Sequence, residues 1–519
     1  MTKSATRRTF LASAAGATLA ACTRDEQERA QRRPNILFAI ADDQSWPHAS
    51  ALGSKWVSTP AFDRVAREGA LFTHSFATCP SCTPSRTSVL SGRHIWQTGE
   101  GGVLYGTLPP DLPLATHRLE DAGYHVGYTG KPWQPGDWKA GGLTRHPNGK
   151  EYNARKHSGP IPAGIDERDY AANFEDFLAD RPDDTPFFFW YGCTEPHRVY
   201  EDGVGVRNGK NLAEIEPPDF LPDTEVVRSD LADYAFEIEW FDTQLTKMLA
   251  RLEKAGELDN TLVIVTSDNG MPFPRAKVNL YDWGVRMPLA MRFPAEIPAG
   301  TQVDALVSHV DFAPTWLSVA GVEAPAGMAG SSLLPLPAED APARGQVYSG
   351  LERHTWCRPD GATYPARSIR TKDYLYIRNF EPDRWPTGGP DFVSSNKTFH
   401  GDVDACPTKT FMVEHREEFP GEYALGFGKR PSEELYVIAD DPGQVRNLAD
   451  EPALADQKQQ LRARLEAYLR ETGDPRIEGQ DHWQSYIYRQ TIGFGATFNQ
   501  ALPEEEREAA RGRGSHKPE

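Results

Sequence analysis

One pattern recurs along the chain and constrains the fold more than any other: a short, continuous apolar run that ends abruptly in polar residues. Such runs cover residues 35–41, 126–129, 186–192 and 262–266. A strand that is apolar at every position is buried on both faces, which is the pattern of a parallel sheet. Segments with helical periodicity lie between the runs, notably residues 228–255. Strands that alternate with helices predict an α/β fold, with a large doubly wound, mixed or mostly parallel sheet flanked by helices.

The pattern changes near residue 345. Residues 367–370 and 374–378 alternate in polarity, as strands exposed on one face do, and residues 461–469 have helical periodicity. We therefore expect a smaller C-terminal α+β domain that contains an antiparallel sheet. The expected segments are an export signal over residues 1–21, a tether over 22–33, a main domain over 34–345, the smaller domain over 346–485 and a charged tail over 486–519.

The first residues have the features of an export leader. Arg7 and Arg8 precede a weakly apolar run that is too short to span a bilayer and ends in Leu-Ala-Ala-Cys at Cys22. The paired arginines look like a twin-arginine export signal, and the four-residue ending looks like a bacterial lipobox. This predicts a bacterial periplasmic or outer-surface protein that contacts the membrane only through a lipid on Cys22. The alternative is that Cys22 is an incidental thiol after an ordinary cleaved signal.

The balance of charge excludes one class of partner. The chain carries 56 Lys and Arg against 74 Asp and Glu, which gives a formal charge of −18. An acidic chain is a poor general binder of nucleic acid, so no nucleic-acid partner is expected. Six cysteines in 519 residues are too few for a disulfide scaffold.

Two of the apolar runs end in residues that bind hard cations. Asp42 and Asp43 follow the first run, and Asp268 and Asn269 follow the run at residues 262–266. In open α/β sheets, ligands bind beyond the carboxyl ends of the strands. Three carboxylates and an amide oxygen at neighbouring strand ends would suit Ca²⁺ or Mg²⁺. Each pair taken alone is also common in turns and helix caps.

A cysteine lies at the start of a predicted helix. Thr83 followed by Pro84 is typical of an N-cap and a first helical position, which places Cys82 at the positive end of the helix dipole. Two interpretations compete here. Cys79 and Cys82 could form a dithiol redox pair, or Cys82 could be a single modified residue with Arg86 one helical turn further on.

Residues 82–86, with the sequence Cys-Thr-Pro-Ser-Arg followed by Leu90 and Gly92, resemble the signature of type I sulfatases. The resemblance extends from about residue 35 to residue 449 and implies an alkaline-phosphatase-like sheet. It also implies that a formylglycine-generating enzyme oxidises Cys82 to formylglycine before folding is complete, and that the hydrated aldehyde is the nucleophile. That order fits a twin-arginine signal, because the modification would have to precede export of the folded chain.

The resemblance implies a role for each of the other site residues. Asp42, Asp43, Asp268 and Asn269 match the family's Ca²⁺ ligands, which the formylglycine at position 82 completes. Lys131, Lys277 and Arg86 would bind the sulfate, and His197 would protonate the leaving group. Taken singly, the histidine and the lysines could equally be a capped loop residue and solvated surface charges.

One position departs from the family pattern. Many sulfatases carry a histidine two residues after the first lysine, where this chain has Trp133. That histidine is thought to help release sulfate from the aldehyde, so the group that does this here is open. Trp133 could instead shape the sugar-binding side of the site.

Residues 268–281 and the Pro-His-Arg sequence at 196–198 resemble the heparan N-sulfatase (sulfamidase) branch. The resemblance implies a sulfated glycan substrate, either an N-sulfated glucosamine or an O-sulfated sugar of an algal polysaccharide. The smaller domain offers candidate glycan contacts in polar loops, with an ordinary polar surface as the alternative. These candidates are His354, Trp356, Arg358 and Arg367.

Three other functions compete with a sulfatase. The first is a phosphate or phosphonate monoester hydrolase of the same superfamily, which comparative rates would distinguish. The second is a periplasmic thiol oxidoreductase that uses Cys79 and Cys82, although this leaves the carboxylates and Arg86 unexplained. The third is a non-catalytic lipoprotein that binds sulfated glycans and keeps Cys82 as a thiol.

Overall fold

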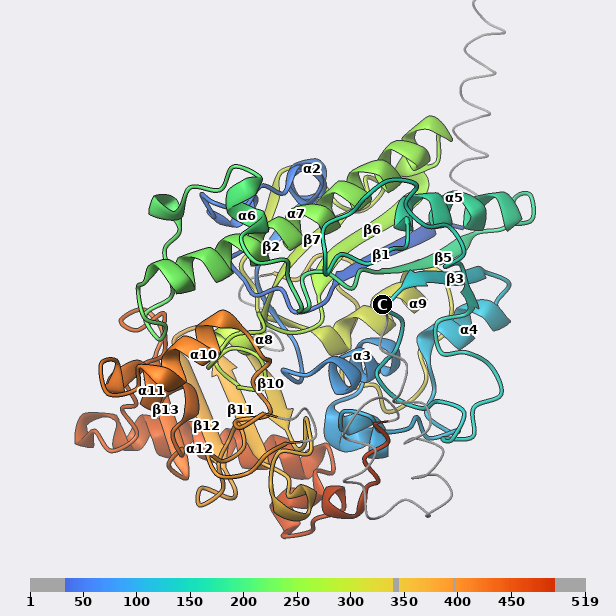
Figure 1. Cartoon of the computed structure of the whole chain (residues 1–519). Coiled ribbons are helices and arrows are strands. Elements are labelled where there is room, and N and C mark those ends of the chain that lie inside the picture. Colours follow the sequence, from blue (N-terminus) through green and yellow to red (C-terminus); the bar gives the residue numbers. More distant parts are fainter. Residues whose placement is uncertain (1–32, 339–344, 395–397, 491–519) are drawn as a thin grey trace, which may run out of the picture.

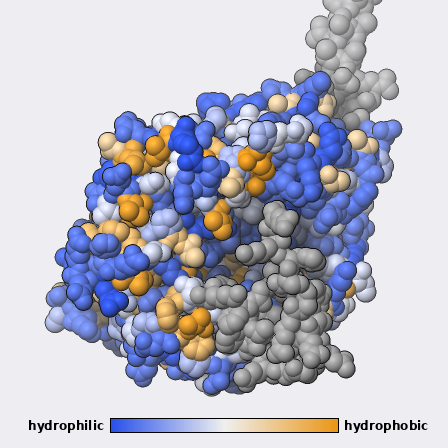
Figure 2. Space-filling model, viewed as in Figure 1, coloured by the Kyte–Doolittle hydropathy of each residue, from blue (hydrophilic) through white to orange (hydrophobic). Residues whose placement is uncertain are grey.

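The computed structural model describes residues 33–338, 345–394 and 398–490 (Figure 1). The predicted export signal, Cys22 and nearly all of the tether lie outside these ranges, as does the tail beyond residue 490. Within the described residues, no helix combines the length and the apolar character needed to cross a membrane. The face of the molecule in Figure 2 is mostly hydrophilic, with its hydrophobic residues in scattered groups.

The described residues form a main sheet of nine strands in the order β4-β3-β5-β1-β6-β7-β2-β8, with β9 also paired to β2. Its centre, β3-β5-β1-β6, is parallel, and β7 runs antiparallel to both of its neighbours. This confirms the predicted mixed, mostly parallel sheet. The strands are β1 (Asn35–Ala41), β2 (Ala70–Phe76), β3 (His125–Gly130), β4 (Lys150–Glu151), β5 (Phe187–Gly192), β6 (Thr261–Ser267), β7 (Arg286–Arg292), β8 (Thr301–Val303) and β9 (Val307–Ser308).

Helices cover both faces of this sheet (Figure 1), which is why the central strands are apolar at every position. Ile36 and Phe38 of β1 belong to the core beneath α3 (Cys82–Ser91), α4 (Ala115–Asp121) and α9 (Phe312–Val319). Leu37 and Ala39, on the opposite face, pack in the core shared with α2 (Pro60–Glu68), α5 (Tyr170–Asp180) and the 30-residue α7 (Glu225–Lys254). Alternate residues of one strand thus bury against two layers of helices.

A second, antiparallel sheet forms the lower left of Figure 1, in the order β10-β11-β12-β13. Its strands are β10 (Gln346–Leu351), β11 (Ala366–Thr371), β12 (Tyr374–Asn379) and β13 (Glu433–Val437). The helix α12 (Ala455–Glu471) packs on it through Leu461, Leu465 and Leu469. Two short helices, α10 (Pro407–Glu414) and α11 (Pro420–Phe427), precede β13, while α6 (Val204–Arg207) and α8 (Asp282–Val285) belong to the loops of the main sheet.

The expectation that this second sheet is exposed on one face is wrong. Every residue of β11 is buried. On one face, Arg370 pairs with Asp282 of the main domain, with nitrogen–oxygen distances of 3.0 Å to both carboxylate oxygens. On the other face, Arg367 pairs with Asp474, which follows α12. The alternating polarity of the sequence therefore comes from buried ion pairs.

Candidate active site

Side chains from four adjacent parallel strands meet at the carboxyl edge of the main sheet. Lys131 directly follows β3, and His197 lies in the loop after β5. Asp42 and Asp43 follow β1, whose last residue, Ala41, is aligned with Ser267 at the end of β6. Asp268 and Asn269 directly follow β6. The alternation of buried strands and helices has therefore brought residues that are far apart in the sequence to one edge.

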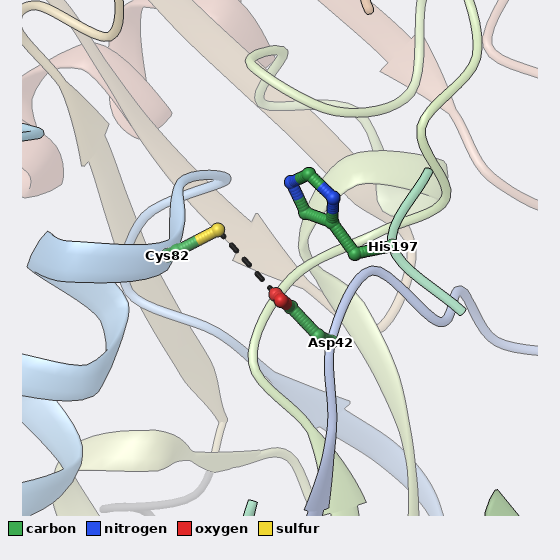
Figure 3. Close-up of side chains that lie close together, drawn as sticks. All are labelled: Asp42, Cys82 and His197. Atoms are coloured by element: carbon green, nitrogen blue, oxygen red, sulfur yellow. Dashed lines mark hydrogen bonds between the residues drawn. The ribbon is translucent and has the colours of Figure 1, made fainter. Parts of the chain in front are cut away.

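Cys82 is the first residue of α3, and its side chain projects toward Asp42 (Figure 3), with Sγ 3.4 Å from Asp42 Oδ1. The helix begins slightly earlier than the sequence indicates: Ser81 is the N-cap, and Pro84 lies inside the first turn, where its missing N–H costs no hydrogen bond. Cys82 is 2% exposed. It therefore lies at the base of the site and at the positive end of the helix dipole.

Three buried cations alternate with the carboxylates. Arg86 Nε donates to Asp268 Oδ2 at 2.8 Å, and its Nη1 donates to the backbone oxygen of Lys131 at 2.8 Å. Lys131 pairs with Asp42 Oδ2. Lys277 Nζ lies 2.7 Å from Asp43 Oδ2. Each of the three cations thus offsets the charge of one buried carboxylate.

His197 occupies the open side of the site, with 31% of its side chain exposed. Its Nδ1 lies 2.7 Å from the carbonyl oxygen of Arg198 and must donate to it, because a carbonyl only accepts. The other ring nitrogen, Nε2, faces the site, 3.8 Å from Asp43 Oδ2. In Figure 3 the ring lies across from Cys82, so its free nitrogen can reach a group bound between them.

The backbone at the site adopts conformations that most residues avoid. Asp43 has φ 74° and Val278, beside Lys277, has φ 65°, which is a rare conformation for a β-branched residue. The Val278 N–H donates to the oxygen of Pro80 at 2.9 Å, which ties the Lys277 loop to the loop before Cys82. Strain of this kind concentrates at functional sites, where the surrounding structure holds it in place.

Burial and neighbouring charges shift the pKa values of the carboxyl groups in opposite directions. Burial would raise the pKa of Asp42, but Lys131, His197 and other cations outweigh it and lower that pKa. Burial raises the pKa of Asp43 despite Lys277. It also raises the pKa of Asp268, with a further contribution from Asp42. Burial, reinforced by Asp42, likewise raises the pKa of the Cys82 thiol.

The donor set fits a divalent cation. Oxygen atoms of Asp42, Asp43 and Asp268 lie within 4.8 Å of one another, and all three side chains are buried. Asn269 Oδ1 is buried without a hydrogen-bond partner among the described residues. Carboxylate oxygens beside an unpaired amide oxygen are the ligands that Ca²⁺ accepts.

Two residues at the rim of the site carry no signal in the sequence. Asp404 Oδ2 lies 3.0 Å from Lys277 Nζ, and Asp404 lies 127 residues further along the chain in an irregular segment. Tyr105 has φ 58°. Burial raises its pKa, and the charge of Lys131 offsets part of that increase. No periodic pattern or motif marks either position, so neither could be predicted from the sequence.

The candidate glycan contacts differ in where they lie. His354 reaches the site, with Nδ1 2.7 Å from Ser81 Oγ. Trp356 is partly exposed. Arg358 is buried and pairs with Asp402 at 2.8 Å. The guanidinium of Arg367 is fully buried between Glu352 and Asp474, so it holds the smaller domain together and is not a glycan contact.

Trp133 also lies elsewhere than we expected. Its ring is 1% exposed and belongs to the core beneath α3, and its indole N–H donates to Thr87 Oγ1 at 2.8 Å. A side chain buried in this way cannot line the sugar-binding side. Trp133 therefore supports α3 from behind.

The dithiol interpretation finds no geometric support. Cys79 and Cys82 are both free and buried. Burial raises the pKa of each thiol. Redox-active cysteines are accessible and have lowered pKa values, which is the opposite of what is found here.

Comparison with known proteins gives the family. The Sulfatase family profile matches residues 34–322, which include every strand of the main sheet. The profile described as "N-sulphoglucosamine sulphohydrolase, C-terminal" matches residues 276–386. An ulvan-active sulfatase of Formosa agariphila is 26% identical over 491 residues, covering 85% of this chain and 76% of the relative. The N-sulphoglucosamine sulphohydrolase of Homo sapiens is 28% identical over 495 residues, covering 87% of this chain and 92% of the relative.

A solved structure described as a complex with its substrate, D-glucosamine-2-N,6-O-disulfate, shares the fold. It matches with a TM-score of 0.60 and 21% identity over 87% of this chain and 100% of that one. From the family profile, the relatives and the fold together, the chain belongs to the formylglycine-type sulfatase family of the alkaline-phosphatase superfamily and is a sulfatase, an enzyme that hydrolyses sulfate esters.

Proposed function

We propose that the protein is a Ca²⁺-dependent sulfohydrolase that removes O-sulfo or N-sulfo groups from a sulfated saccharide with a formylglycine formed from Cys82. The observation that carries the proposal is the position of Cys82 at the start of α3, 3.4 Å from Asp42 and beside Arg86 and Lys131. This arrangement supplies both halves of what a sulfate ester requires: a nucleophile and a buried set of cations.

The chain's own residues would divide the work as follows. Asp42, Asp43, Asp268 and Asn269 would hold the Ca²⁺, which would polarise the sulfate oxygens when bound. Hydrated formylglycine would supply the nucleophilic oxygen. Lys131 and Lys277 would bind the sulfate, and each is held in place by a carboxylate. Arg86 would orient Asp268 and stiffen the backbone at Lys131.

His197 would donate the proton to the leaving atom. When S–O or S–N bond breakage places charge on that atom, a proton on Nε2 can neutralise it. The Nδ1–H bond to the carbonyl of Arg198 fixes the ring so that Nε2 points into the site. Its partial exposure leaves room for the saccharide on that side.

Mass spectrometry of the peptide that contains residue 82 tests the nucleophile. The protein would be made with a formylglycine-generating enzyme, which is its expected processing partner, and the side chain examined for a thiol or an aldehyde. An aldehyde, together with release of sulfate from sulfated glycans, is the expected result. An unmodified thiol in an active preparation would contradict the proposed nucleophile.

A phosphate or phosphonate monoester hydrolase remains the second candidate. The cation set of Arg86, Lys131 and Lys277 would suit that anion as well. Comparing kcat/KM for 4-nitrophenyl sulfate and 4-nitrophenyl phosphate distinguishes the two, and we expect the sulfate ester to be preferred. A preference for phosphate would reverse the assignment. A binding protein without catalysis would retain its thiol and release no sulfate from any ester.

The relatives support a sulfated saccharide as the substrate class. One is active on ulvan and another is a sulphohydrolase of N-sulphoglucosamine, so a sulfated saccharide is the shared chemistry. Screening O-sulfated algal oligosaccharides against N-sulfated glucosamines by ion chromatography of released sulfate would choose between them.

We propose further that the chain is exported by the twin-arginine route to the bacterial periplasm or outer surface and is lipid-anchored at Cys22. The support is the leader sequence alone. Changing Arg7 and Arg8 to Lys should retain the protein in the cytoplasm, and Cys22→Ala should release it from the membrane fraction. Unchanged fractionation of both variants would contradict this proposal.

A further inference from the structure

Asp404 places a carboxylate from the C-terminal part of the chain beside the proposed proton donor. Its Oδ2 accepts a hydrogen bond from Lys277 Nζ at 3.0 Å, and the same nitrogen lies 2.7 Å from Asp43 Oδ2. One of its oxygens also lies within 4.8 Å of a ring nitrogen of His197. Because the leaving atom would accept a hydrogen bond from His197, the saccharide atoms next to that leaving atom would lie within reach of Asp404.

Asp404 has capacity to bind a further donor. Its side chain is 22% exposed, whereas Asp43 is fully buried. Among the described residues, only Lys277 donates a hydrogen bond to it. Burial would raise the pKa of Asp404, but the charge of Lys277, contributions from the nearby histidines and the hydrogen bond from Lys277 together lower that pKa, so the group is an anion at pH 7. Its Oδ1 is therefore an unused, charged acceptor at the edge of the site.

The loop that carries Asp404 is held rigidly. Asp402 Oδ1 accepts from the backbone N–H and the hydroxyl of Thr355, both at 2.7 Å, and its Oδ2 accepts from Arg358 at 2.8 Å. Lys409 Nζ donates to the oxygens of His400 and Val403 at 3.0 and 2.7 Å. These bonds fix the segment on both sides of Asp404, as preorganised recognition requires.

The same network positions His354, which precedes Thr355 and contacts Ser81 Oγ at 2.7 Å. Burial lowers the pKa of His354 to about 4, so the ring is neutral at pH 7. It adds no positive charge beside Asp404. The nearest cation, Lys277, is already shared with Asp43.

We propose that Asp404 is a specificity-determining residue, which accepts a hydrogen bond from a hydroxyl or amino group on the substrate carbon next to the sulfated one and excludes a second anionic group there. The inference rests on the proposed sulfohydrolase function. A neighbouring hydroxyl would satisfy the unused oxygen of Asp404. A neighbouring sulfate or carboxylate would place like charges together, which is costly in a partly buried site.

Matched aryl esters test this selectivity. Phenyl sulfate has no neighbouring donor, catechol monosulfate has a hydroxyl next to the sulfate ester, and catechol disulfate has a second sulfate there. We expect Asp404→Ala to lower the ratio of kcat/KM for catechol monosulfate over phenyl sulfate by about 10- to 100-fold, because a hydrogen bond to a charged group is lost. The same change should raise kcat/KM for catechol disulfate by about tenfold.

The intrinsic reactivity of each ester cancels when the same kcat/KM ratio is compared between the wild type and a variant. Asp391→Asn is the matched control, because Asp391 is an exposed acid in the same C-terminal region, and it should leave all ratios unchanged. Asp404→Asn keeps the shape and should retain part of the preference for the hydroxyl while admitting the disulfate. Unchanged ratios in Asp404→Ala would overturn the inference, although phenyl sulfate hydrolysis would still support a sulfatase.

A binding measurement makes the test independent of turnover. In a Cys82→Ala background with Ca²⁺, calorimetry should show tighter binding of catechol monosulfate than of phenyl sulfate, and Asp404→Ala should remove the difference. Equal dissociation constants for both esters before the Asp404 change would also overturn the inference. An enzyme that hydrolyses none of the esters but keeps this binding preference would contradict the proposed reaction alone.

Discussion

His197 is the residue whose replacement should separate substrates by their leaving groups. We expect His197→Ala to lower kcat on a saccharide sulfate by about 10²- to 10⁴-fold, because an alkoxide needs a proton as it leaves. Hydrolysis of 4-nitrophenyl sulfate should fall much less, since nitrophenolate leaves without one. Steady-state kinetics on the two substrates measure the difference, and equal losses on both would argue against proton donation by His197.

Trp133 should behave as a core residue. Trp133→His introduces the side chain common in related sulfatases, but it removes a ring packed behind α3 and its bond to Thr87. We expect the free energy of unfolding to fall by about 3 kcal/mol and kcat not to rise. Trp133→Phe, which loses only the indole hydrogen bond, should cost about 1 kcal/mol. A stable, faster Trp133→His enzyme would contradict the buried role.

Residues that follow strands or belong to a recognisable motif could be predicted from the sequence, and those in irregular loops without a motif could not. Asp42 and Asp268 could be paired because parallel strands bring their carboxyl ends to one edge. Asp404 could not, since it lies in a loop with no periodicity whose course depends on bonds made by Asp402 and Lys409. Arg367 was misplaced because buried and exposed arginines look alike in a sequence.

Among the elements, β11 and α8 are joined by the buried pair of Arg370 and Asp282. Removing one partner leaves a buried charge unpaired, so Asp282→Asn should lower the free energy of unfolding at pH 7 by about 3 kcal/mol. Asp282→Glu, which keeps the charge, should cost less. Denaturant unfolding of the two variants measures this, and equal stability of Asp282→Asn and the wild type would contradict the role of the pair.

The pair of Arg370 and Asp282 should make the free energy of unfolding fall as the pH is lowered. Burial would raise the pKa of Asp282, but Arg370, with smaller contributions from Arg286 and Gln444, lowers the pKa from 3.8 to about 2. The folded state therefore binds this proton less strongly than the unfolded chain, so the contribution to stability is present above pH 3.8 and is lost as the pH falls toward 2. Between pH 5 and pH 3, the difference in stability between wild type and Asp282→Asn should narrow by about 1 kcal/mol. A constant difference would show that the pKa is not lowered.

The element order was readable because long apolar runs leave few alternatives to a buried parallel sheet. The burial of the second sheet was harder to predict from the sequence. Its alternating sequence fits a half-exposed sheet and a sheet buried by ion pairs equally well, and only the partners, Asp282 and Asp474, decide between them. Such partners lie too far away in the sequence to be inferred from a local pattern.

For the whole molecule, a cation bound between β1 and β6 would stabilise the centre of the main sheet. Because Ca²⁺ would bind the folded state and relieve the repulsion among three buried carboxylates, free Ca²⁺ at a hundred times its Kd should raise the free energy of unfolding by about 3 kcal/mol. Melting temperatures in EGTA and in increasing Ca²⁺ measure the effect. Asp268→Asn is the control and should show little response; an equal response in both proteins would place the stabilising ion elsewhere.

The burial of Cys82 at the base of the site has a consequence for any preparation of this enzyme. Once α3 has packed against the sheet, a processing enzyme, which has to enclose the target side chain, can no longer bind around Cys82, because that side chain is 2% exposed. Chains that escaped oxidation during synthesis would then stay inactive for their lifetime. Specific activity would therefore report the competition between maturation and folding, and two batches of identical sequence and fold could differ severalfold in the fraction of working molecules.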